Sequence, residues 1–269
     1  MRTLACNGLG GGTAGLAIDL ILYPIEVFKT RMQASLHGKT LSPNASFYQG
    51  FSINTMMAVP SAALYFSGFE LGKKFYREDI SRSGKGPKHF NVFESAFGGC
   101  VAEVMTNVFR TPLEHLKTRI QAGQIRSFFG GVKEIYSLGG VGGLYQGFLP
   151  LIARDVPFSM LQLVAYDRCR TSKSFLGREE WYFASLRGFI CGAFAAALTT
   201  PLDVLKTLSM THDTSQKVKI PQLVKTLWVN AGVTGFFKGG SYRMFYICSS
   251  SSVFFLVYEK AFAYFNHVL

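Results

Sequence analysis

Charged residues are scarce in this sequence. Asp, Glu, Lys and Arg make up only 16% of its 269 residues, and apolar residues make up 48%. Soluble domains usually hold about 25% charged residues, so the scarcity points to a membrane protein with hydrophilic interruptions. Acidic residues are rarer than basic ones, with 16 Asp and Glu against 28 Lys and Arg. The basic residues are spread along the chain, which argues against nucleic acid and favours anionic lipid headgroups as their partner.

Motifs of known enzymes are absent as well. The five cysteines lack CxxC spacing, and the five histidines lack the spacing of metal ligands. There is no GxSxG, HExxH or P-loop motif, and no GxGxxG motif in a strand-to-helix context. We therefore expect a protein that is not an enzyme and that uses no metal or catalytic cofactor.

What the sequence does contain is one stretch of eleven residues in three copies, at 23–33, 111–121 and 200–210. Each copy closes an apolar run and has a proline at its second position. The prolines Pro24, Pro112 and Pro201 are 88 and 89 residues apart, so the chain is a threefold array of one long unit. Proline kinks a helix because it lacks an N–H and clashes with the preceding turn.

An acidic and a basic residue follow each proline. The two are three residues apart, so they lie on one helix face. Charges at the ends of apolar helices are costly unless they meet partners. We expect each acid to pair with the base of the next copy, in a ring that closes one end of a three-part bundle. The six residues are Glu26, Lys29, Glu114, Lys117, Asp203 and Lys206.

Apolar runs and polar breaks divide the chain into long helices joined by shorter segments. We expect the long helices at about residues 4–33, 47–69, 91–121, from 142 onward, 182–210 and 242–265. Shorter amphipathic helices are expected at about 126–138 and 221–230, along the membrane surface. A charged linker at 77–89 separates the first two copies of the unit.

The pattern Pro-x-Asp/Glu-x-x-Lys/Arg, in three copies at this spacing, resembles the signature of the mitochondrial carrier family, over essentially the whole chain. The resemblance implies an all-α membrane protein with six transmembrane helices in three pseudo-symmetric repeats of two. Short surface helices would lie on the matrix side, around a central cavity. The repeats would be residues 1–80, 88–173 and 180–269. It also implies a monomeric transporter in the mitochondrial inner membrane, with both termini toward the intermembrane space.

In that family two sets of charged residues act as gates. The ring of six would be the matrix gate. Gln33 and Gln121 match the glutamines that brace two of its pairs, whereas Met210 is expected not to hydrogen-bond as a brace. The cytoplasmic gate would consist of Glu70, Lys73, Asp167, Arg170 and Glu259. Phe262 stands where a third base is expected, so this gate forms at most two pairs and should open more easily.

Further polar residues lie inside the apolar helices and point to a wet interior. Asp19 precedes Glu26 by seven residues, so the two share a helix face. Glu103, Arg110 and Lys117 form one stripe at the same spacing. Glu103 and Arg110 could also pair with each other structurally, and the sequence leaves this alternative open.

Arg154 and Asp155 place two charges within the fourth long helix. They point about 100° apart on a helix, so we expect them not to neutralise each other. In the family, an arginine followed by an acid at this point resembles carriers of amino-acid-like molecules. The full set of expected substrate-binding residues is Asp19, Glu103, Arg110, Arg154, Asp155, Gln162 and Arg243.

Several stretches resemble one group within the family, the mitochondrial S-adenosylmethionine carriers. They are 17–24, 60–62, 154–159 with Gln162, 198–204, and Glu103 with Arg110 before Pro112. This resemblance implies import of S-adenosylmethionine in exchange for S-adenosylhomocysteine. Arg154 would bind the carboxylate, and the cavity acids would bind the positive charges. The adenine would need an apolar slot, lined by Met57, Tyr65 or residues 247–251.

The residues leave other functions open. The chain could carry another cationic amino acid or a nucleotide, or it could be a carrier-like scaffold that no longer transports. The element Phe237-Lys238-Gly239 matches one that helps bind cardiolipin in the family. We therefore expect cardiolipin as a structural lipid.

Overall fold

The computed structural model describes residues 2–37, 46–82, 92–171, 181–213 and 219–250, and every regular element in these ranges is a helix. In chain order the elements are α1 (Arg2–Ala34), the short 3-10 helix η1 (Ser35–His37), α2 (Phe51–Arg82), α3 (Val92–Gln121), α4 (Phe128–Leu144), α5 (Phe148–Thr171), α6 (Trp181–Thr211) and α7 (Ile220–Phe236). Residues 240–250 are helical as well. The all-α class expected from the sequence is confirmed for these residues.

The same succession of elements recurs along the chain. A long helix with a proline inside it comes first, and a turn with a left-handed glycine and a second helix follow later in each unit. The prolines Pro24, Pro112 and Pro201 lie within α1, α3 and α6. The glycines Gly50, Gly147 and Gly239 have φ angles of 84°, 91° and 79°. A Cβ at Gly147 would lie 2.6 Å from Met210 Cγ, so glycine also permits a close approach of the turn to α6.

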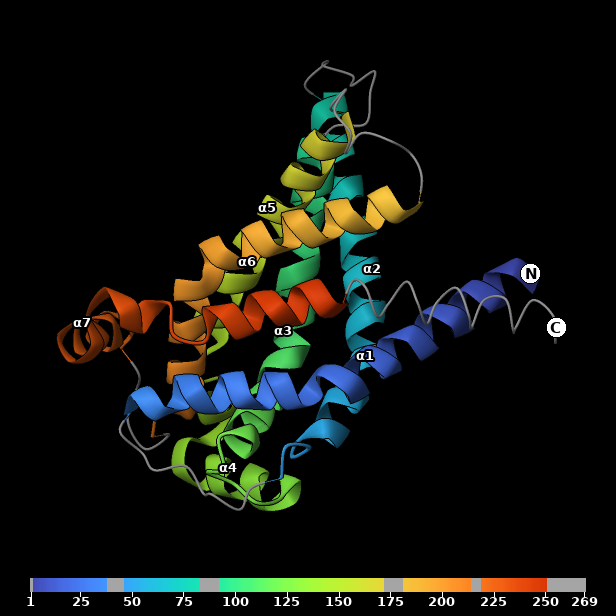
Figure 1. The fold of residues 1–269 in the computed structure, drawn as a ribbon. Coiled ribbons are helices and arrows are strands. Elements are labelled where there is room, and N and C mark those ends of the chain that lie inside the picture. The colour runs from blue at the N-terminus through green and yellow to red at the C-terminus, as the bar shows by residue number, and fades with distance from the viewer. Residues whose placement is uncertain (1, 38–45, 83–91, 172–180, 214–218, 251–269) are drawn as a thin grey trace.

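Helices α2, α3 and α5 run along one direction, and α1, α6 and residues 240–250 cross them at a large angle (Figure 1). Helix α3 packs mainly against α2 and α5, and α6 packs mainly against α5. Helix α1 contacts α6 and α3 as well as α2. The three proline-bearing helices α1, α3 and α6 therefore all touch one another.

The shorter helices α4 and α7 dock against the C-terminal ends of α3 and α6. Ile135 of α4 packs in a buried cluster with Leu116 and Ile120 of α3. Leu227 of α7 packs in the same way with Val204 and Leu208 of α6. A glycine with a left-handed φ, at 140 in α4 and 232 in α7, ends the straight part of each helix. These contacts hold the motif-bearing ends of α3 and α6 in place.

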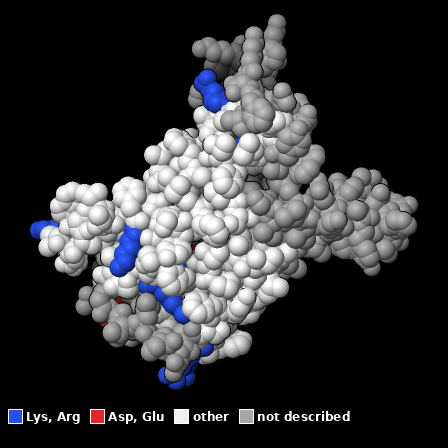
Figure 2. Space-filling model, viewed as in Figure 1, with Lys and Arg blue, Asp and Glu red and all other residues white. Residues whose placement is uncertain are grey.

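The visible surface carries few charges. Figure 2 shows Lys and Arg as scattered spots and almost no Asp or Glu on the face it presents. Large apolar side chains such as Val59, Phe66, Phe194 and Leu198 are more than half exposed. Among the described residues, one stretch, Leu186–Thr211, is long and apolar enough by length and composition to span a membrane. The other long helices carry more charged residues, many of which line the pocket described below.

Several helix boundaries differ from the sequence prediction. Helices α4 and α7 end at Leu144 and Phe236, beyond the expected ends near 138 and 230. Helix α2 does not end near residue 69 but continues to Arg82, through part of the expected linker. Ion pairs between Lys73 and Glu70 at 3.6 Å, and between Lys74 and Glu78 at 4.0 Å, support this extension along one helix face. Helix α5 begins at Phe148, not at 142, because the left-handed Gly147 breaks the backbone just before it.

Candidate functional site

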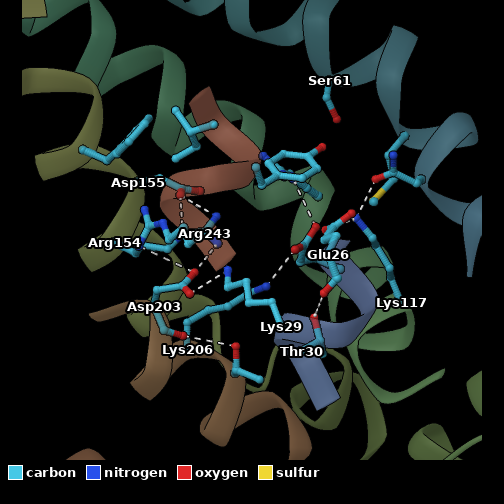
Figure 3. Close-up of a pocket in the computed structure, with 18 of the residues that line it drawn as sticks. Glu26, Lys29, Thr30, Ser61, Lys117, Arg154, Asp155, Asp203, Lys206 and Arg243 are labelled. Atoms are coloured by element: carbon cyan, nitrogen blue, oxygen red, sulfur yellow. Dashed lines mark hydrogen bonds and ion pairs between the residues drawn. The ribbon is translucent and has the colours of Figure 1, made fainter. Parts of the chain in front are cut away.

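Three ion pairs join α1, α3 and α6 just past their prolines (Figure 3). In each pair the acid of one motif meets the base of the next motif along the chain, and the last acid meets the first base. The pairs are Lys117 Nζ to Glu26 Oε1 (2.7 Å), Lys206 Nζ to Glu114 Oε1 (2.7 Å) and Lys29 Nζ to Asp203 Oδ2 (2.6 Å). All three pairs expected from the motif spacing are present. We call them the floor pairs.

A set of hydroxyl contacts repeats in the same threefold order. The residue after each motif lysine is threonine, and its Oγ1 donates to the last residue of the next motif. The contacts are Thr30 to Gln121 Oε1 (3.0 Å), Thr118 to Met210 Sδ (3.6 Å) and Thr207 to Gln33 Oε1 (2.7 Å). All six side chains are buried. Met210 accepts this bond through its thioether sulfur, a weak acceptor, and the donor is Thr118, not a charged group of the ion pairs.

Two of the motifs add an arginine that reaches the end of the next proline-bearing helix. Arg31 Nε donates to the backbone oxygen of Gln121 at 3.0 Å, and Arg119 Nε donates to that of Met210 at 3.1 Å. The last carbonyl groups of a helix have no partner within the helix, so these bonds satisfy them. The third motif has Leu208 at this place, and its side chain is part of the apolar cluster with α7.

The floor pairs form part of the lining of a pocket of about 600 Å³. The lining includes all six floor residues and all seven residues that the sequence predicts for substrate binding, namely Asp19, Glu103, Arg110, Arg154, Asp155, Gln162 and Arg243. It also includes apolar and aromatic side chains, among them Met57, Tyr65, Phe158, Tyr246 and Ile247. The structure thus brings the predicted residues together in one place, from helices far apart in the sequence.

The charges of the lining balance, with six acids and six bases. A cationic substrate would favour an excess of acidic side chains. In this pocket such an excess exists only locally, around particular residues. Within the described residues, the carboxylates of Asp19 and Glu103 have no cation within ion-pair distance, whereas the other four acids do. Glu103 Oε1 instead accepts a hydrogen bond of 2.5 Å from Ser159. Arg110 pairs with Glu114 at 3.3 Å and not with Glu103, so the alternative pairing is absent from this structure.

Arg154 and Asp155 do pair, against the sequence prediction. Arg154 Nη2 and Nε lie 2.5 Å and 2.6 Å from Asp155 Oδ1, and Nη1 lies 3.2 Å from Asp203 Oδ1. The angle between neighbours on a helix fixes only the start of each side chain, and the long arginine side chain can turn back to its neighbour. Asp155 is buried and also accepts a hydrogen bond of 3.2 Å from Asn107, so an unpaired charge there would be costly.

Comparison with known proteins identifies the family. The family model described as "Mitochondrial carrier protein" matches residues 88–175 and 178–268, which is more than half of the chain. The chain belongs to the mitochondrial carrier family. Members of this family are transporters, and the ion-pair geometry of this carrier follows its threefold motif.

Relatives of this carrier match it over nearly its whole length. "S-adenosylmethionine carrier 1, chloroplastic/mitochondrial" of Arabidopsis thaliana is 31% identical over 96% of this chain and 78% of its own. "Mitochondrial S-adenosylmethionine carrier protein" of Xenopus tropicalis is 30% identical over 96% of both chains. "Probable S-adenosylmethionine carrier 2, chloroplastic" of Arabidopsis thaliana is 30% identical over 97% of this chain and 74% of its own. The resemblance seen in the motifs is therefore confirmed.

The two glutamines expected to brace the floor pairs make different contacts in this carrier. Gln33 Nε2 donates to Asp203 Oδ2 at 2.9 Å, so it touches a floor pair directly. Gln121 Nε2 donates to the Tyr23 hydroxyl at 3.1 Å, and the Tyr23 ring lies 5.7 Å from the Lys117 ammonium. Gln121 therefore reaches its floor pair through Tyr23.

The structure describes only some of the residues that are expected to form a cytoplasmic gate. Lys73 Nζ lies 3.6 Å from Glu70 Oε1, but both residues belong to α2, so this pair does not join two helices. The side chains of Asp167 and Arg170 lie outside the described part of the structure, as do Glu259 and Phe262. The gate on this side stays a prediction.

Three kinds of site residue were missed by the sequence analysis. The motif threonines repeat directly after each lysine, and that repetition was visible in the sequence. Asn54 Oδ1 accepts from the Lys117 ammonium at 2.6 Å, and Asn107 supports Asp155 from α3. A neutral amide inside an apolar helix was the available signal for both, because such a group is buried only where it finds partners.

Proposed function

We propose that this carrier imports S-adenosylmethionine into mitochondria in exchange for S-adenosylhomocysteine. S-adenosylmethionine carries a carboxylate, an ammonium and a sulfonium group. Its receptor therefore needs carboxylates for two positive groups, a base for one negative group and an apolar slot for adenine. The names of the relatives supply the substrate, and the chemistry of the pocket supports it.

One observation carries the proposal. Asp19 and Glu103 face the pocket as carboxylates with no cation at ion-pair distance among the described residues, and Arg154 lines the same pocket. A ligand with two positive groups and one carboxylate complements this arrangement. The volume of about 600 Å³ lies within the range of about 300–1,000 Å³ that is usual for sites of metabolite-sized ligands. Met57, Tyr65 and Ile247 offer the apolar surface for adenine.

The proposed mechanism is alternating access across the inner membrane. Three repeats of two transmembrane helices surround the pocket, and both termini face the intermembrane space. With the floor pairs formed, the pocket is closed toward the matrix. Substrate binding weakens the floor pairs, the pocket opens toward the matrix, and the cytoplasmic gate closes. We take the carrier to be a monomer, with cardiolipin as a structural lipid near Phe237-Lys238-Gly239.

The test is exchange in proteoliposomes. Vesicles loaded with S-adenosylhomocysteine should take up labelled S-adenosylmethionine, and vesicles without internal substrate should take up far less. Asp19→Asn and Glu103→Gln should each lower the initial rate roughly 10- to 100-fold, because a charge-assisted contact with the ligand is lost. Glu78→Gln is the matched control, since Glu78 is exposed at the end of α2 and outside the pocket lining.

Wild-type vesicles that exchange lysine or a nucleotide but not S-adenosylmethionine would replace the proposed substrate by one of the alternatives. A pure protein that binds S-adenosylmethionine without exchanging any metabolite would favour the scaffold. Full activity of both carboxylate variants would show that neither Asp19 nor Glu103 is needed to bind the substrate.

A further inference from the structure

Asn54 contacts a floor pair from α2, a helix that carries none of the three motifs. Lys117 Nζ lies 2.6 Å from Asn54 Oδ1 and 2.7 Å from Glu26 Oε1, so the ammonium is held between two oxygens. Lys117 is only 2% exposed, so its ammonium depends on protein oxygens such as these for hydrogen bonds. Asn54 therefore contributes to the contact between α1 and α3 at the floor pair Lys117–Glu26.

The position of Asn54 recurs in the fold with different chemistry. Asn54, Leu151 and Arg243 each stand four residues after one of the left-handed glycines. Leu151 is fully buried and apolar, and Arg243 Nη1 lies 3.8 Å from Asp203 Oδ1. At two of the three positions the side chain therefore contacts a floor residue, Lys117 or Asp203. Of the three side chains, Asn54 alone accepts a hydrogen bond from a floor base.

The same side chain faces Asp19. The Asn54 amide interacts with the Asp19 carboxylate, and both side chains line the pocket. A carboxamide has an acceptor oxygen and a donor NH₂ group. One side chain can therefore serve the ammonium of Lys117 and the carboxylate of Asp19 at once. Asp19 is also one of the two pocket acids without an ion pair in the described part of the chain.

We propose that Asn54 is a positioning residue that passes the occupancy of Asp19 on to the floor pair Lys117–Glu26. The inference rests on the proposed function, since it takes the ligand group at Asp19 to be a cation. A bound cation takes over the carboxylate that the Asn54 amide faces, and it brings positive charge close to Lys117. The amide turns away, Lys117 loses the acceptor at 2.6 Å, and the floor pair loosens.

The first test separates this role from ligand contact. Asn54→Leu has nearly the same size and introduces the residue found at the equivalent position 151. It should lower the maximum exchange rate about tenfold and change KM by less than about threefold, because binding at Asp19 persists and its effect on the floor is lost. In the Asp19→Asn background, Asn54→Leu should not lower the exchange rate further, because both substitutions interrupt the same coupling between Asp19 and the floor pair. Thr55→Val is the control, because among the residues that the structure describes Thr55 bonds through its side chain to the Phe51 carbonyl of its own helix.

The second test needs no substrate. Melting temperatures of the ligand-free Asn54→Leu, Asp19→Asn and double variants form a cycle, which should depart from additivity by about 2 °C or more. Additive melting temperatures would overturn the link between the two residues, whether or not the protein transports. A wild type without S-adenosylmethionine exchange would instead count against the proposed function. If wild type exchanges and Asn54→Leu raises KM as much as it lowers the rate, Asn54 is a ligand contact and the inference is wrong.

Discussion

Arg154 Nη1 lies 3.2 Å from Asp203 Oδ1, so the residue expected to bind the substrate carboxylate is bonded to an acid of the floor. Asp203 also accepts from Lys29 at 2.6 Å and from Gln33 at 2.9 Å. A substrate carboxylate at Arg154 would compete with Asp203 for the guanidinium group and would break the bond between Arg154 and Asp203. Binding of a substrate carboxylate at Arg154 would therefore affect the contact between α1 and α6.

Arg154→Lys should lower S-adenosylmethionine exchange at least about tenfold. Lysine keeps the charge but lacks the planar fork that reaches Asp155 and Asp203 together. The measurement is the initial rate in loaded proteoliposomes, with Arg126→Lys at an exposed position as the matched control. An Arg154→Lys rate equal to the wild-type rate would show that the fork geometry is not used.

The motif threonines should differ in their contribution to stability. Thr207→Val removes the hydroxyl that donates to Gln33 Oε1 at 2.7 Å, and leaves a buried acceptor unsatisfied. Such a loss costs about 1–3 kcal/mol, or several degrees of melting temperature. Thr118→Val removes a donor to the sulfur of Met210 at 3.6 Å, a weak acceptor, so its shift should be clearly smaller. Equal shifts of the two variants, measured by thermal unfolding, would contradict the contacts described.

The packing of α5 on α6 places two cysteines within reach of each other. Cys169 Sγ lies 3.7 Å from Cys191 Sγ, and neither is in a disulfide. Mild treatment with hydrogen peroxide should join them, because a small shift brings the sulfurs to the bond length of about 2 Å. The two thiols give up two protons and two electrons, and the peroxide is reduced to two waters. Peptide mass spectrometry without reductant should find this link in preference to any with Cys248. Links of Cys248 at equal yield would contradict the packing.

The floor could be predicted from the sequence because its rules are local. A spacing of three residues places Glu26 and Lys29 on one helix face, and the threefold repeat supplies a partner for each. Cavity residues such as Asp19 and Glu103 could be predicted because a charge in an apolar helix must face the interior. These arguments need only helical geometry and the cost of burying charge.

The remaining features depend on the tertiary structure. The pairing of Arg154 with Asp155 follows from the burial of Asp155 and from the reach of the long arginine side chain, which helical angles do not determine. The extension of α2 past residue 69 is supported by contacts with α3, such as the ion pair of Arg77 with Glu94 at 2.7 Å. The role of Asn54 appears only once α2 lies beside Lys117. In each case the deciding partner comes from the folded environment and not from the sequence pattern.

We propose that the floor pairs close the pocket in one state and reform in every transport cycle. Charge reversal at Glu26 and Lys117 is the decisive experiment. Each single reversal, Glu26→Lys or Lys117→Glu, places like charges about 2.7 Å apart and should lower exchange at least about tenfold. The double reversal restores an opposite pair and should recover a substantial part of the wild-type rate. Single variants that exchange at the wild-type rate, or a double variant no faster than either single variant, would show that the pair Lys117–Glu26 does not gate transport.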